Sequence, residues 1–157
     1  MSANQKFPLT ASTNYGVTTI SSGSGASVIP AATGSFASRV KGRILLQVQD
    51  KGQAWYISPM NGKRYSLGRP DDAFRVMKSL GLGISNINFN KLSSSAAAKS
   101  LAGRILIKVE DNGRAYYVNP VDLKLYYLGR PADAFGVMRS LGLGISNNDL
   151  SQIGIGN

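Results

Sequence analysis

The chain of 157 residues contains no cysteine and no histidine, and only eight of its residues are acidic. The missing side chains exclude disulfide frameworks, thiolate or imidazole metal sites, cysteine nucleophiles and Ser-His-Asp triads. The lack of cysteine does not identify the compartment, because packing and assembly can stabilise a surface protein without disulfides. We expect a protein that is not an enzyme and that needs no metal and no cofactor.

Long apolar runs are also missing. No stretch of about 18 apolar residues occurs, so we expect no membrane span. The N-terminal sequence MSANQKFPLTAST has one lysine and lacks the apolar centre of a secretory signal, so the sequence shows no export route.

Acidic residues are scarce enough to leave a net charge of +10, and this excess is unevenly spread. Residues 39–90 carry +6, whereas residues 102–157 carry +1. A nucleic-acid-binding module that is repeated is expected to be basic in both copies. Nucleic acid is therefore an unlikely partner, and we expect any binding to polyanions to depend on the first half of the chain.

The chain contains an internal repeat. LGRPDDAFRVMKSLGLGISN at 67–86 returns as LGRPADAFGVMRSLGLGISN at 128–147, and about 29 of the 45 positions from Gly42 to Asn86 match those 61 residues later. Each copy is near the lower size limit for an independently folding domain, so we expect the copies to support each other. The sequence predicts an arm (1–38), a first repeat module (39–90), a linker (91–101) and a second repeat module (102–157).

Residues 1–38 are rich in Ser, Thr, Gly and Ala and hold a single charge, Lys6. Such a segment has too little apolar surface to fold alone, but its scattered apolar residues suit extended docking on a partner. The residues expected to contact a neighbouring subunit are Tyr15, Val17, Ile20, Val28 and Ile29.

Each module begins with strand patterns. RILLQVQ (43–49) alternates apolar and polar residues, and Asp-Lys-Gly (50–52) supplies turn chemistry before a second strand, AWYIS. A short third strand, RYSL, follows, and the second copy repeats this order. The sequence predicts an α+β fold of two tandem modules, each a short antiparallel β-meander with one helix, preceded by an extended arm.

The helix is predicted from about 70 to 80 and from about 131 to 141, because proline suits the first helical turn and Asp72 and Asp133 offset the helix dipole there. Gly81 and Gly142 are expected to end the helices in a left-handed conformation. The glycines of SLGLGIS follow the helix rather than precede it, which argues against a phosphate-binding loop. The pair Asp71-Asp72 could suggest acid/base catalysis, but Ala132 replaces Asp71 in the second copy, which favours a structural role.

Adjacent aromatic residues are the best candidates for a binding surface. Neighbouring strand residues face opposite ways, so we expect one ring of each pair to face the core and the other to face away from it. If Trp55 and Tyr116 lie under the helix, Tyr56 and Tyr117 face outward. Outward rings beside Lys63 and Arg64 could stack on sugars or bases, or contact another subunit. Packing across a thin sheet is the alternative interpretation.

The segment GRILLQVQDKGQAWYISPMNGKRYSLGRPDDAF, followed by LGLGISN, resembles a small repeat of predicted secreted, cell-surface and peptidoglycan-associated proteins of candidate-phyla bacteria. The resemblance covers both modules and implies an extracytoplasmic structural or accessory module, located outside the cell or at its surface.

We expect a non-catalytic structural protein that binds copies of itself, as a subunit of an extracellular filament or surface layer. Two similar modules give faces that can meet head to tail, and the arm could dock on a neighbouring subunit. A module that binds cell-wall glycan or another anionic polymer is the main alternative, and charge-driven nucleic-acid binding is a third.

Overall fold

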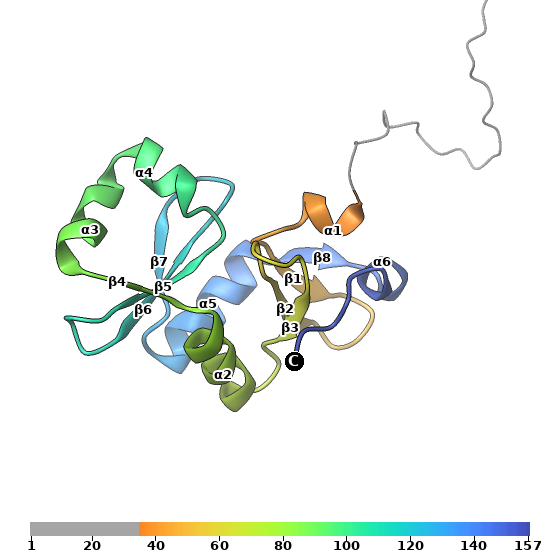
Figure 1. Ribbon diagram of the computed structural model, residues 1–157. Coiled ribbons are helices and arrows are strands. Elements are labelled where there is room, and N and C mark those ends of the chain that lie inside the picture. Colours follow the sequence, from red (N-terminus) through yellow and green to blue (C-terminus); the bar gives the residue numbers. More distant parts are fainter. Residues whose placement is uncertain (1–34) are drawn as a thin grey trace, which may run out of the picture. The chain divides into compact units, whose positions relative to one another are not determined.

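The computed structural model describes residues 35–157, and the predicted contacts of arm residues 1–34 lie outside this part (Figure 1). Two four-stranded sheets are present, in the orders β3-β2-β1-β8 and β4-β5-β6-β7. We call them sheet A and sheet B. Helices and strands both occur, as the predicted α+β class requires.

Sheet A contains the meander of the first repeat and sheet B that of the second. The strands of sheet A are β1 (Ile44–Gln47), β2 (Gln53–Ile57), β3 (Arg64–Ser66) and β8 (Leu143–Ile145). Those of sheet B are β4 (Leu82–Ile84), β5 (Ile105–Lys108), β6 (Arg114–Val118) and β7 (Leu125–Tyr127). The three strand patterns predicted for each copy therefore form antiparallel meanders, with tight turns at left-handed Lys51 and Asn112.

The LGI segment of each repeat joins the sheet of the other repeat. β8 runs parallel to β1, and β4 runs parallel to β5. The Val48 N–H donates to Ile145 O at 3.1 Å, and the Val109 N–H donates to Ile84 O at 3.2 Å. The predicted modules 39–90 and 102–157 are thus repeats of sequence, but each sheet takes three strands from one repeat and its fourth from the other.

The long helices begin and end where the sequence predicts: α2 spans Pro70–Leu80 and α5 spans Pro131–Leu141. Each starts with proline in its first turn and buries an apolar stripe. The stripes belong to one core formed by both repeats, in which Ile44, Tyr56 and Val76 pack with Ile105, Tyr117 and Val137.

The prediction of a left-handed helix end at Gly81 and Gly142 is wrong. Gly81 has φ −68° and ψ 137°, and Gly142 has φ −66° and ψ 130°, which are ordinary extended values. Close packing explains glycine here instead. A Cβ atom on Gly81 would lie 2.6 Å from Cγ1 of Ile107, and one on Gly142 would lie 2.5 Å from Cγ of Leu46. Each helix therefore ends directly against the sheet that its following strand joins.

Short helices cover the outer faces of the sheets, which the prediction of one helix per module did not include. α1 (Phe36–Arg39) and α6 (Asn147–Ser151) lie on sheet A, where Leu45, Ile57 and Leu150 are buried together. α3 (Asn86–Asn90), the 3₁₀ helix η3 (Lys91–Ser93) and α4 (Ser95–Ser100) lie on sheet B. The arm is therefore helical from Phe36. Most of the predicted linker 91–101 is also helical, and its Leu92, Ala97 and Leu101 pack in the outer core of sheet B.

The two repeats meet most closely at Gly42 and Gly103. Both glycines have left-handed backbones, with φ of 76° and 79°, and a Cβ on either would lie 2.5 to 2.6 Å from the other's Cα. The Tyr56 hydroxyl donates to Gly103 O at 2.7 Å, and the Tyr117 hydroxyl donates to Gly42 O at 2.6 Å. These reciprocal hydrogen bonds satisfy buried polar groups in the centre of the structure.

Candidate functional site: two related grooves

Two grooves lie at equivalent places on the two sheets, and each combines residues of both repeats. Groove A has a volume of about 800 Å³ and groove B about 550 Å³. In groove A, the β1–β2 turn and the β3–α2 turn of the first repeat face α5 of the second. In groove B the same elements of the second repeat face α2 of the first. Each groove contains a helix of the opposite repeat because the LGI strand that follows this helix joins the sheet of the other repeat. We call this arrangement the strand exchange.

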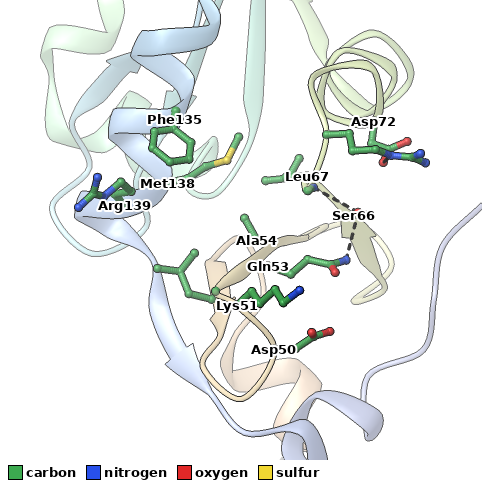
Figure 2. Close-up of a pocket in the computed structure, with 14 residues that line it drawn as sticks. Asp50, Lys51, Gln53, Ala54, Ser66, Leu67, Asp72, Phe135, Met138 and Arg139 are labelled. Atoms are coloured by element: carbon green, nitrogen blue, oxygen red, sulfur yellow. Dashed lines mark hydrogen bonds and ion pairs between the residues drawn. The ribbon is translucent and has the colours of Figure 1, made fainter.

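Groove A has an aromatic and apolar side and a polar side. Figure 2 shows Phe135, Met138 and Arg139 of α5 opposite Gln53 and Ser66 of the meander. The Phe135 side chain is 58% exposed, and the Arg139 guanidinium lies 5.8 Å from the centre of its ring. An exposed ring opposite amide and hydroxyl groups can pack against the face of a sugar ring while polar groups bind its hydroxyls.

One substitution between the repeats changes the wall of the grooves. Ser66 stands where the second repeat has Tyr127, whose ring packs on Tyr116 at a centroid distance of 5.3 Å. The Ser66 hydroxyl accepts a 3.3 Å hydrogen bond from the Gly68 N–H and a 3.5 Å bond from Gln53 Nε2. Groove A is therefore lined by a small hydroxyl side chain where groove B is lined by a tyrosine.

Some cationic side chains of groove A form ion pairs with a carboxylate and others do not. The buried carboxylate of Asp72 accepts hydrogen bonds from Arg69 Nε at 3.0 Å and from Arg75 Nη2 at 2.6 Å. The hydrogen bond from Arg69 is the main reason that the pKa of Asp72 is held below its ordinary value, and Arg75 adds to the effect. Among residues 35–157, no ion pair includes Lys51 or Arg139.

The carboxylate of Asp133 has the same role in the second repeat. It accepts hydrogen bonds from Arg130 at 2.6 and 3.0 Å, and this contact lowers its pKa. Gly136 replaces Arg75 in this copy, so Asp133 has one arginine partner instead of two. Arg69 and Arg130, which directly precede the two helices, are the partners common to both repeats. The carboxylates of both acids therefore bind an arginine at the start of a helix.

One ring of each aromatic pair faces the central core, as predicted, but it is Tyr56 and Tyr117 that lie there, so the outward orientation considered for them is wrong. Tyr56 and Tyr117 are only 2% and 1% exposed, and burial raises the pKa of both hydroxyls. They lie in the central core, so a ligand cannot stack on them. Trp55 and Tyr116 face the opposite sides of the sheets and are half-buried under the short helices.

The predicted binding residues are therefore not brought together as one site. The guanidinium of Arg64 lies 5.0 Å from the centre of the Trp55 ring and donates to Leu150 O at 2.7 Å. The indole N–H of Trp55 donates to Gln47 at 3.0 Å. These contacts attach α6 to sheet A. Lys63 is exposed, but Tyr56, its expected aromatic partner, is buried.

An apolar groove of about 190 Å³ separates α2 from α5, and we call it the interhelix groove. The exposed rings of Phe74 and Phe135, together with Met77 and Met138, line it, so both repeats contribute the same residue types. Ala73, Phe74, Met77 and Leu80 recur at helical spacing, which alone would place Phe74 on the core face, but its side chain is exposed. The alignment of the two copies gives a better indication of where the grooves lie, because Ser66 of the first copy is replaced by Tyr127 in the second, and both residues line a groove.

Comparison of the chain with protein-family models, with curated proteins and with solved structures finds no match. Within residues 35–157, no group of three or more acidic, cysteine or histidine residues is placed to bind a metal ion. None of the helices in that part combines the length and apolar character needed to cross a bilayer.

Proposed function

We propose that the chain is a non-catalytic structural protein that assembles with copies of itself into an extracellular filament or surface layer. One observation carries the proposal: large apolar side chains are exposed at equivalent positions of both repeats. The pairs are Val48 and Val109, Met60 and Val121, and Phe74 and Phe135, with exposures of 58% to 69%.

Single exposed apolar residues are common on monomeric proteins, but their recurrence at equivalent positions gives one molecule two similar apolar surfaces. Contacts between non-identical surfaces generate open polymers when the rotation between subunits does not close a ring. The two repeats differ in charge and in groove size, which favours a contact between unlike surfaces. The extracellular location rests on the resemblance to secreted repeat proteins.

In this proposal the N-terminal arm links subunits. Its apolar residues Tyr15, Val17, Ile20, Val28 and Ile29 would dock on a neighbouring copy. We expect the full chain to sediment as species far heavier than its 16.7 kDa monomer. The chain that starts at Ser35 keeps the exposed apolar surfaces, but we expect contacts between them to be too weak to hold subunits together without the arm, so it should be monomeric. Its melting temperature should change little, because residues 35–157 contain all three cores. Sedimentation velocity and thermal melts at matched concentrations test this. Equally heavy species without the arm would contradict it.

Binding of an anionic cell-wall polymer is the second candidate, and groove A favours it. Lys51 and Arg139 line this groove together with the exposed ring of Phe135. Cations that bind successive anionic groups give an affinity that falls as the salt concentration rises.

We expect Lys51→Asn to reduce retention on a polyanion column more than Lys124→Asn does. The second repeat has Asn112 at the position of Lys51, with nearly the same left-handed φ, 52° against 53°, so the substitution suits the turn. Lys124 is an exposed lysine of the second repeat and loses the same charge. The salt concentration that elutes each variant is the measurement. Equal shifts would mean that retention follows net charge and not groove A.

A further inference from the structure

Two of the four sheet edges, β4 and β8, are equivalent and open in the described part of the chain. The edge of β3 is covered by the C-terminal tail, since the Arg64 N–H donates to Gly154 O at 2.8 Å and the Gly156 N–H donates to Arg64 O at 2.9 Å. β4 and β8 are both formed by Leu-Gly-Ile, and within residues 35–157 each pairs with one strand only. Each molecule therefore carries the same open edge twice, once on each sheet.

The backbone groups along these edges form a regular series of acceptors and donors. The Val109 N–H donates to Ile84 O, so the ladder to β5 uses the groups of Ile84, and those of Gly83 point the other way. Within residues 35–157, the Gly81 C=O, the Gly83 N–H and C=O and the Ser85 N–H bind no other backbone group. The equivalent unpaired groups of β8 are the Gly142 C=O, the Gly144 N–H and C=O and the Ser146 N–H.

This series is complementary to itself when two strands run antiparallel. With Gly83 of one copy opposite Gly144 of another, each of the four groups on β4 meets a group of the opposite type on β8. Neither strand contains a proline or a charged residue, which commonly protect exposed edges. Exposed valines lie beside both central glycines: a Cβ on Gly83 would be 3.1 Å from Cγ1 of Val109, and one on Gly144 would be 3.0 Å from Cγ1 of Val48.

Charged side chains at the ends of the strands favour the pairing of β4 with β8. Glu110 lies at the C-terminal end of β4, because the residue before it bonds to the last residue of that strand. Arg139 lies in the last turn of α5, just before the N-terminal end of β8. Antiparallel strands bring these two ends together. Both residues are exposed, and neither forms an ion pair within residues 35–157. Pairing of β8 with β8 would place Gln49, the equivalent of Glu110, there instead.

We propose that β4 of one copy pairs antiparallel with β8 of the next copy, with Gly83 opposite Gly144. The inference rests on the proposed self-assembly and identifies the two unlike surfaces that meet. One molecule cannot make this contact alone, because its β4 and β8 belong to different sheets and do not pair (Figure 1). Each added copy leaves one β4 and one β8 free, which produces an open polymer.

The contact between two such short strands is weak by itself. This agrees with the monomer expected from the chain that starts at Ser35. In the full chain, the arm that links two copies raises the effective concentration of one edge near the other. The arm and the edges therefore act together.

Disulfide trapping tests the pairing, because the chain has no cysteine. Directly opposed residues of antiparallel strands have Cα atoms about 5.5 Å apart, which a disulfide can span. Full-length Gly83→Cys is mixed with full-length Gly144→Cys and oxidised gently, and thermal melts establish that both variants are folded. We expect at least about tenfold more disulfide-linked dimer from the mixture than from either variant alone. A yield from the mixture no higher than that from a single variant would overturn the proposal.

A lysine at the edge provides a second test that needs no cysteine. Val109→Lys places a charge beside Gly83, where it should hinder the approach of another strand. Sedimentation velocity of the full-length variant should show loss of the heavy species. Val121→Lys changes a similarly exposed valine in the turn between β6 and β7 and should leave them unchanged.

The two tests separate failure of the pairing from failure of self-assembly. If Val109→Lys assembles as the unsubstituted chain does and the cross-links are not selective, the edge is wrong but self-assembly stands. A monomeric unsubstituted chain would overturn self-assembly and the pairing together.

Discussion

Gly42→Ala is expected to lower the free energy of unfolding by about 2 to 5 kcal/mol. A left-handed backbone costs an alanine about 1 to 2 kcal/mol, and forcing an atom into a packed core costs about 1 to 3 more. The added Cβ would lie 2.6 Å from the Cα of Gly103, and backbone cannot turn aside as a side chain can. Separating the two glycines would also strain the hydrogen bonds from Tyr56 and Tyr117.

Gly52→Ala is the matched control for Gly42→Ala. Gly52 is also left-handed, with φ 73°, but no atom lies within 4 Å of an added Cβ. Its cost should be limited to the backbone term of about 1 to 2 kcal/mol. Urea unfolding of the two variants measures the difference. Equal losses would mean that the close approach of the two repeats at Gly42 and Gly103 does not hold in solution.

An isolated first repeat, residues 35–95, is expected to fold only as a dimer. In the intact chain its β4 pairs with β5, the equivalent of its own β1, and that partner is missing from the fragment. A second copy can supply β1 instead, and the exchange is then reciprocal, as in a domain-swapped dimer. The helical and strand signals in circular dichroism should therefore decrease on dilution.

Light scattering after size-exclusion chromatography measures the mass of this fragment. Residues 35–157 serve as the control, because both repeats are then present in one chain and a monomer is expected. A folded monomer of residues 35–95 would contradict the strand exchange, since its β4 would have to pair within its own sheet.

Local patterns were sufficient to predict α2, α5 and the strands of both meanders. Pro70 and Pro131 identify the first helical turn, and alternating residues such as Ile44 and Leu46 identify strands. These signals act over a few neighbouring residues, and the repeat presents each of them twice. The helix bounds predicted from them agree with the structure.

The strand exchange was not predictable from such patterns. The LGI segments follow their helices so closely that the sequence does not indicate which sheet each will join. The orientation of Tyr56 was missed for a related reason: both faces of sheet A are covered, so alternation does not distinguish the inner face from the outer. The short helices α1 and α6 that cover the outer face have few residues each and therefore weak periodicity.

The candidate site depends on these long-range features. Groove A exists because α5 of the second repeat faces the meander of the first, and no spacing in the sequence indicates that Phe135 and Ser66 lie opposite each other. The difference between Ser66 and Tyr127 is visible in the aligned repeats, but only the structure shows that both positions line a groove.

Self-assembly is the central claim, and electron microscopy of the negatively stained full-length protein tests it most directly. At micromolar concentration we expect filaments or sheets with a regular subunit repeat, and isolated small particles from the chain that starts at Ser35. Uniform small particles from the full chain, at every concentration up to the limit of solubility, would contradict the claim.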